Sequence, residues 1–207
     1  MKREPVFDLP HKGLRVALSE LTAAATSNDF GAEAERLGFE NLFRSVWELI
    51  AAHSETEERV TFAELDARAP GASHALRAEH RALDELYEAL ERRVGDGSYA
   101  ADAGKFSDDL NRFSAAFQAH MNREEDEIEP LVWQHFSDGE IREHRRAIMA
   151  ADGPEKLLKY FRFVFAALTE KETAFFLERL KAMFPTEAFA RAEKLAAAAH
   201  NRRKLRL

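Results

Sequence analysis

The sequence predicts an all-α protein, an up-down-up-down four-helix bundle followed by a C-terminal helical extension. Four long segments carry apolar residues at helical spacing, and the second half of the bundle region repeats the pattern of the first. The chain also has 16 phenylalanines and much Ala and Leu, a composition that favours a helical core over a sheet. We expect the bundle to occupy residues 7–136 and the extension to occupy residues 137–207.

The first predicted helix begins at Pro10 and ends at about Thr26. Proline suits the first turn of a helix, and the polar residues after Thr26 provide an exit. One face of this helix carries His11, Leu14, Leu18, Leu21 and Ala25. The second helix should run from about Gly31 to Glu58. Its core face, with gaps that alternate between four and three residues, reads Phe39, Phe43, Val46, Ile50, His53 and Glu57.

The third predicted helix follows a loop that contains Pro70 and Gly71. Ser73 is a suitable N-cap, and a Gly-rich turn ends the helix near Val94. Its core face reads Ser73, Leu76, His80, Leu83, Tyr87, Leu90 and Val94.

The fourth predicted helix runs from about Ala100 to Glu129. Pro130 should end or kink it, because proline lacks a backbone N–H and clashes with the preceding turn, and residues 131–136 then continue briefly. Its core face repeats the gaps of the second helix. That face reads Phe106, Leu110, Phe113, Phe117, His120 and Glu124.

The extension should consist of further helices. Capping residues open them at Ser137, at residues 152–154, at Thr169 and at Thr186. Many phenylalanines make this region strongly apolar, so it must be covered. The default interpretation is that this region packs within the chain. The alternative is that the Phe-rich tail forms a homodimer interface or binds a protein partner.

Composition excludes several classes of function. The net charge of −7 does not suit a nucleic-acid or anionic-membrane protein, and the absence of cysteine excludes disulfides, thiolate metal sites and cysteine nucleophiles. The N-terminus lacks the apolar run of a signal peptide, and no segment is apolar enough to span a membrane. We therefore expect a soluble, cytoplasmic protein. No phosphate-binding loop, Rossmann fingerprint or Ser-His-Asp set is present.

The motif H-x-x-x-E-E occurs twice, at residues 53–58 and 120–125. A histidine and a glutamate four residues apart lie on the same face of a helix. Each copy closes a long helix, whereas His11 and His80 each stand near the start of the preceding helix. In an up-down-up-down bundle these positions fall at one end. Six side chains should therefore converge: His11, His53, Glu57, His80, His120 and Glu124.

Such a cluster is expensive to bury without a cation. Each buried, unpaired carboxylate costs several kcal/mol, against a typical net stability of roughly 5–15 kcal/mol. We therefore interpret the cluster as a dinuclear metal site rather than as ordinary core histidines. Imidazole and carboxylate ligands without thiolate suit two iron ions, and after iron they suit manganese or zinc. Glu57 and Glu124 can bridge the two ions, with the four histidines as terminal ligands.

These residues, in this order, resemble the hemerythrin-like (HHE cation-binding) domain family over residues 7–136. The resemblance implies a non-haem di-iron centre that binds dioxygen or responds to it. The sequence departs from the invertebrate oxygen carriers, whose third helix has an H-x-x-x-H pair where this chain has Asp84 after His80. Their last helix has a five-residue His-to-Asp step, where this chain offers both Glu124 and Glu125. The chain thus looks more like the iron- and oxygen-responsive branch of the family.

The expected function is to bind or sense dioxygen or a related small oxidant, in iron, oxygen or nitric-oxide homeostasis. We expect a binding protein rather than an enzyme. A di-iron oxidase or peroxidase is one alternative, and a metal-free helical interaction module is another. Whether Glu58, Asp84 or Glu125 joins the ligands stays open at this point. His74, His135, His144 and His200 lie off the four core faces and are expected at the surface.

Overall fold

The structure, a computed structural model, describes residues 3–204 and is all-helical over that range, with no β-strand. Each π-helical or 3-10 segment is labelled η. The elements in order are α1 (Asp8–Ser27), α2 (Glu33–Thr56), η1 (Glu57–Thr61), α3 (Phe62–Arg68), α4 (His74–Gly95), η2 (Ser98–Ala100), α5 (Ala103–Arg123), η3 (Glu124–Ile128), α6 (Glu129–His135), α7 (Asp138–Ala167), α8 (Glu170–Lys181) and α9 (Thr186–Lys204).

The chain divides into two compact units. One unit comprises residues 18–136, and the other comprises the residues before 18 together with those from 137 onward. Helix α1 therefore begins in one unit and ends in the other. The division of the chain into domains 7–136 and 137–207 stays a prediction.

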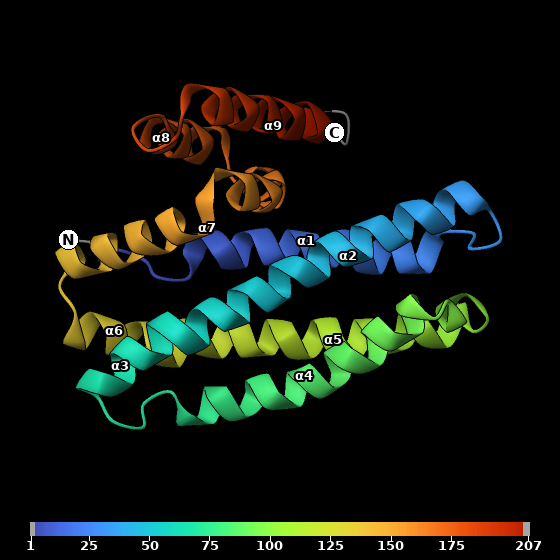
Figure 1. Cartoon of the computed structure of the whole chain (residues 1–207), viewed down its shortest axis with the longest axis horizontal. Coiled ribbons are helices and arrows are strands. Elements are labelled where there is room, and N and C mark those ends of the chain that lie inside the picture. The colour runs from blue at the N-terminus through green and yellow to red at the C-terminus, as the bar shows by residue number, and fades with distance from the viewer. Residues whose placement is uncertain (1–2, 205–207) are drawn as a thin grey trace. The chain divides into compact units, whose positions relative to one another are not determined.

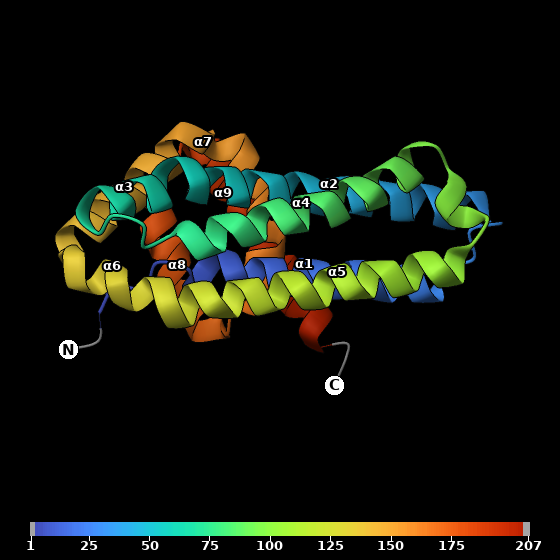
Figure 2. The ribbon, with the colours of Figure 1, turned by 90° about the horizontal axis from the view of Figure 1, so that it is seen from below.

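In the unit of residues 18–136, the long helices α2, α4 and α5 run lengthwise (Figures 1 and 2). Figure 1 shows that α2 and α5 run in one direction and α4 in the other. Helix α4 packs on α5. The end of α2, the start of α4 and the end of α5 consequently lie at the same end of this unit.

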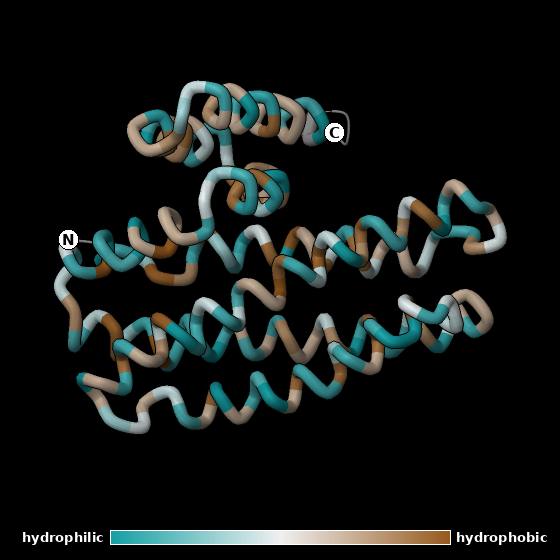
Figure 3. Tube along the Cα trace, in the orientation of Figure 1, coloured by the Kyte–Doolittle hydropathy of each residue, from teal (hydrophilic) through white to brown (hydrophobic). Residues whose placement is uncertain are grey.

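The predicted core faces are buried. Every residue predicted on the faces of the first, second and fourth helices is buried, and so is the third face except for Tyr87 and Val94, which are half-buried. Along α2, α4 and α5, apolar positions alternate with hydrophilic ones at the helical repeat (Figure 3). Burial of this apolar face is what holds the long helices together.

Aromatic side chains close the end of this unit that lies far from the histidines. Tyr99, in the 3-10 turn between α4 and α5, is fully buried and contacts Phe30, Phe39 and Phe106 with ring centroids 5.0–5.4 Å apart. Its hydroxyl donates to Glu40 Oε1 at 3.0 Å, so the buried phenol is satisfied. Burial and the Glu40 carboxylate raise the pKa of Tyr99 to about 12.

The sequence predicted the short continuation around Pro130, which is α6, but not the π-helical turns that follow α2 and α5. Each passes without a break into a π-helical turn, η1 or η3, and then into a further short helix, α3 or α6. In each turn the glutamate carbonyl accepts a hydrogen bond from the amide five residues later: Glu57 from Phe62, and Glu124 from Glu129. Pro130 therefore does not end the helix; it occupies the first turn of α6, where its missing N–H is harmless.

Helix α3 was absent from the sequence-based prediction, which left residues 59–67 unassigned. Phe62 and Leu65 of α3 are buried. The turn after it brings Asp66 to the start of α4, where the Ser73 amide donates to Asp66 Oδ1 at 3.0 Å and the Ser73 hydroxyl to Oδ2 at 2.6 Å. Ser73 thus begins α4, but a carboxylate from α3 holds this start, and no backbone amide of α4 donates a capping bond to the Ser73 side chain.

The other unit contains the extension. The caps predicted at Ser137 and Thr169 are both present, each as a capping box with the glutamate three residues later, Glu140 or Glu172. The first two predicted helices of the extension are both present, joined within α7 at Gly153, where the backbone is non-helical with a positive φ of 70° ahead of Pro154. Gly13 of α1 also belongs to this unit, and a Cβ there would lie 2.9 Å from Val164 of α7. Only a glycine lets the two helices approach this closely.

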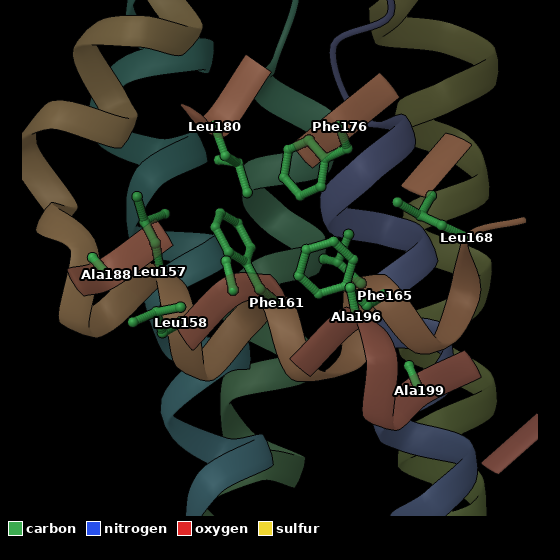
Figure 4. Packing of buried hydrophobic residues seen from close by; sticks show 12 residues of the cluster. Leu157, Leu158, Phe161, Phe165, Leu168, Phe176, Leu180, Ala188, Ala196 and Ala199 are labelled. Atoms are coloured by element: carbon green, nitrogen blue, oxygen red, sulfur yellow. The ribbon is translucent and has the colours of Figure 1, made fainter. Parts of the chain in front are cut away.

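Most of the Phe-rich tail packs inside its own unit. Phe161 and Phe165 of α7 face Phe176 and Leu180 of α8 (Figure 4), and the Phe161 and Phe176 rings meet edge to face with centroids 5.0 Å apart. Small residues of α9 complete the cluster: Ala188, Ala192, Ala196 and Ala199. Phe175 is the exception, with 62% of its surface exposed.

Candidate metal centre

Five of the six predicted ligands lie together in the unit of residues 18–136. They come from three places in this unit. His53 ends α2 and Glu57 opens the π-turn behind it, His80 lies near the start of α4, and His120 ends α5 ahead of Glu124, the first residue of the second π-turn. One ligand atom from each of four of these residues forms a group in which all atoms lie within 4.8 Å of one another: Glu57, His80, His120 and Glu124.

The Nε2 atoms of the three histidines face the two carboxylates. His53 Nε2 lies 3.1 Å from Glu57 Oε1, and His120 Nε2 lies 3.2 Å from Glu124 Oε1. His80 Nε2 lies between the two, 3.6 Å from Glu57 Oε2 and 4.0 Å from Glu124 Oε1. The two H-x-x-x-E motifs thus face each other across the unit, and His80 connects them.

The cluster is almost completely removed from water. The exposed fraction is 3% for Glu57, 0% for Glu124 and 6% or less for the three histidines. Burial lowers the pKa of His80, although its hydrogen bond with Glu58 acts in the opposite direction. The ring is therefore neutral at neutral pH, and neutral imidazole is the form that binds a metal ion.

Aromatic rings fix the orientation of the histidines. Phe62 of α3 stacks on His80 with centroids 5.6 Å apart, and the His80 and His120 rings are 4.4 Å apart. Phe117 contacts both His53 and His120. Helix α3, which the sequence did not predict, therefore supplies one wall of the site.

Two glutamates next to the cluster contact its histidines from outside. Oε1 of Glu58 lies 2.8 Å from Nδ1 of His80, and Oε2 of Glu79 lies 3.0 Å from Nδ1 of His120. The sequence left the role of Glu58 open, and the structure places it beside a histidine rather than inside the cluster. Sequence reasoning missed Glu79. One feature of the sequence could have indicated Glu79. It directly precedes His80 on α4, the helix that packs against α5 and therefore lies near His120.

The remaining candidates are placed as follows. His11 is fully buried on the part of α1 grouped with the other unit, where its ring stacks on Phe7 with centroids 5.1 Å apart. Asp84 is exposed and Glu125 half-buried, and neither belongs to the group of candidate ligand atoms. The four off-face histidines are exposed or half-buried; they are His74, His135, His144 and His200.

Comparison with known protein families agrees with this geometry. The model of the hemerythrin HHE cation-binding domain matches residues 5–132. The chain belongs to this family. Searches of curated proteins and of solved structures found no match. Membership in the hemerythrin family indicates metal binding, typically of iron, and the matched range contains all six predicted ligands.

The residues present fit a metal ion. Within residues 3–204, the Nε2 atoms of His80 and His120 are buried and have no hydrogen-bond partner. Both face carboxylate oxygens, and a cation between them would bind nitrogen lone pairs and carboxylates together. The buried His/Glu cluster of this hemerythrin-family chain could therefore hold a metal ion.

None of the described helices combines the length and apolar composition needed to cross a bilayer.

Proposed function

We propose that this chain is a non-haem di-iron protein that binds or senses dioxygen or a related small oxidant. In this proposal α1, α2, α4 and α5 form an up-down-up-down four-helix bundle around two iron ions. Glu57 and Glu124 bridge the ions, and the terminal ligands are His11, His53, His80 and His120. Manganese and zinc are the metals to consider after iron.

The observation that carries the proposal is the buried set of three histidines and two glutamates. All five are at most 6% exposed, and each carboxylate has an oxygen within 3.2 Å of an imidazole nitrogen. An arrangement of this kind is costly to bury as a purely structural cluster and is stabilised by cations. Membership in the hemerythrin family adds independent support.

His11 is proposed as the sixth ligand on the basis of helix register. Helix α1 is continuous from Asp8 to Ser27, and His11 shares one buried face with Leu18, Leu21 and Ala25. A histidine on that face near the start of α1 stands at the same level as His80 near the start of α4 in an up-down-up-down bundle.

When bound, iron would supply a redox-active centre that can accept a small exogenous ligand. The chain's own residues hold and shield that centre. Burial favours the neutral form of His80, the rings of Phe62 and Phe117 pack against the histidines, and the carboxylates would offset the charge of the cations. A dry, shaped site of this kind suits the binding of a small molecule such as dioxygen.

An optical experiment separates binding from consumption of the ligand. Protein reconstituted anaerobically with ferrous iron should develop a charge-transfer band in air and lose it on degassing. A band that persists while peroxide or dioxygen is used up over many cycles would point to a di-iron oxidase or peroxidase instead. Absence of any band despite bound iron would contradict a role in oxidant binding or sensing.

A further inference from the structure

Two Arg–Glu pairs in the unit of residues 18–136 each support one histidine of the candidate centre. Glu58 follows α2 and reaches His80 on α4, whereas Glu79 lies on α4 and reaches His120 on α5, at the 2.8 and 3.0 Å distances given above. Each contact joins two different helices and involves Nδ1, the ring nitrogen that faces away from Glu57 and Glu124.

The second oxygen of each carboxylate is bound by an arginine. Arg77 pairs with Oε2 of Glu58, and Arg123 pairs with Oε1 of Glu79. An ionised carboxylate that is held by an arginine has no proton to donate and can only accept a hydrogen bond. Nδ1 of each histidine must then carry the proton that is donated.

The two arginines are themselves anchored. Arg77 Nε donates to Ser73 Oγ at 2.8 Å and lies 3.4 Å from Asp66 Oδ2. Arg123 makes a two-point contact with Glu127, at 2.8 and 3.0 Å. Each support therefore reaches from the surface to a buried ring: from Arg77 through Glu58 to His80, and from Arg123 through Glu79 to His120.

We propose that Glu58 and Glu79 are positioning residues of the metal centre. Each holds its histidine in the Nδ1–H tautomer, so that the lone pair of Nε2 points at the shared carboxylates. Without this bond the ring can carry its proton on Nε2, and that tautomer cannot bind a cation there. The inference rests on the proposed metal-binding function and assigns two residues outside the predicted ligand set.

A purely structural role explains the geometry less well. Glu58 and Glu79 are about one-third exposed, and ion pairs at such sites typically contribute little to stability. Each pair also borders a surface depression that reaches its histidine, of about 350 Å³ beside Glu58 and about 310 Å³ beside Glu79. Both weak ion pairs contact Nδ1 of a buried histidine. We therefore infer that they orient the histidine rings rather than stabilise the fold.

The first test needs no metal. Nitrogen-15 NMR of metal-free protein, recorded at an alkaline pH where the histidine rings are neutral, should show His80 and His120 as Nδ1–H tautomers. In Glu58→Ala, His80 should shift toward the Nε2–H tautomer while His120 does not, and Glu79→Ala should give the reverse. Wild-type spectra with Nε2–H tautomers, or alanine variants with unchanged tautomers, would overturn the inference whether or not the protein binds iron.

The second test measures Co²⁺ affinity and its ligand-field spectrum. Glu58→Ala and Glu79→Ala should each weaken Co²⁺ binding roughly 10–100-fold. Glu58→Gln and Glu79→Gln should recover most of it, because an amide oxygen can still accept from Nδ1. Glu85→Ala, an exposed site on the same helix α4, is the matched control. Wild-type affinity in both alanine variants would overturn the inference, whereas failure of the wild type itself to bind metal would refute the proposed function.

Discussion

His80 contacts both glutamates and one other histidine of the candidate centre. Its Nε2 faces both Glu57 and Glu124, its Nδ1 meets Glu58, and its ring lies between Phe62 and His120. The ring thus connects the two H-x-x-x-E motifs that the sequence repeats. Its loss should affect the whole centre rather than one side of it.

Replacing His80 by alanine is therefore expected to lower metal content strongly. The loss of affinity for ferrous iron should exceed the roughly 10–100-fold typical of losing an outer partner, because the variant removes a proposed ligand itself. His144→Ala, a half-buried histidine of α7 outside the cluster, should keep wild-type iron content. Equal losses in the two variants, measured by metal analysis after reconstitution, would refute the assignment.

For individual residues, the sequence predicted the buried face of each long helix. It also predicted the five candidate ligands that lie together in the unit of residues 18–136. Periodicity was sufficient because a helix places every third or fourth residue on one face. Glu79 was not predictable in this way. Its role depends on the rotation of α4 against α5, which brings a residue one step off the core face to within 3.0 Å of His120.

The two π-turns are the most informative elements. After each H-x-x-x-E motif the buried positions continue at steps of four residues: Glu57, Thr61 and Leu65 in one copy, and Glu124, Ile128 and Val132 in the other. A regular α-helix would need an occasional step of three, so the change of spacing marks one extra residue in each helix. π-turns of this kind occur frequently at functional sites.

Deleting one exposed residue of the first π-turn should convert it to a regular α-helix. Arg59 is suitable, because its side chain is 70% exposed. We expect helix content by circular dichroism to be retained, while iron affinity falls by roughly tenfold or more because the carboxylate of Glu57 is no longer held in place. Arg59→Ala, which keeps the length, should bind iron normally. Normal binding by the deletion variant would show that the turn is dispensable.

Helices that begin at a local capping motif were predicted better than the short helix α3, which depends on tertiary packing. The boxes at Ser137 and Thr169 were readable because each depends on residues three apart. Helix α3 was missed because its start is not a cap but a continuation of α2 through a π-turn. No sequence signal marks α3, and Phe62 of this helix packs against His80.

The second capping box gives a pH-dependent prediction. Hydrogen bonds from the Thr169 amide, Lys12 and the Thr169 hydroxyl lower the pKa of Glu172 from 4.5 to about 2. Its charge therefore stabilises the fold above pH 4.5, and this contribution is lost as the pH falls through about 2. Glu172→Gln keeps the cap but removes the charge. It should lower the free energy of unfolding at pH 7 by about 0.5 kcal/mol, as is typical for an exposed pair.

Urea denaturation of both proteins at pH 7 and near pH 2 measures this difference. The deficit of Glu172→Gln should be present at pH 7 and nearly absent near pH 2. An equal deficit at both values would show that the charge of Glu172 does not contribute.

For the whole molecule, the hemerythrin-family match ends at residue 132, so the family accounts for residues 5–132 and not for the extension. The extension has its own apolar core of α7, α8 and α9 residues. The sequence predicted its helices but could not distinguish internal packing from a partner surface. Phe161, Phe165 and Phe176 are buried within their own unit, which leaves exposed Phe175 as the main apolar residue for a partner on α8.

The central claim, a dinuclear iron centre, is tested most directly by metal stoichiometry. Purified protein should be reconstituted anaerobically with ferrous iron, freed of excess metal and analysed for iron per chain. The account predicts about two iron ions per chain, the number that two bridging glutamates and four histidines can hold. Well under one ion per chain after reconstitution would contradict it and would favour a metal-free helical interaction module.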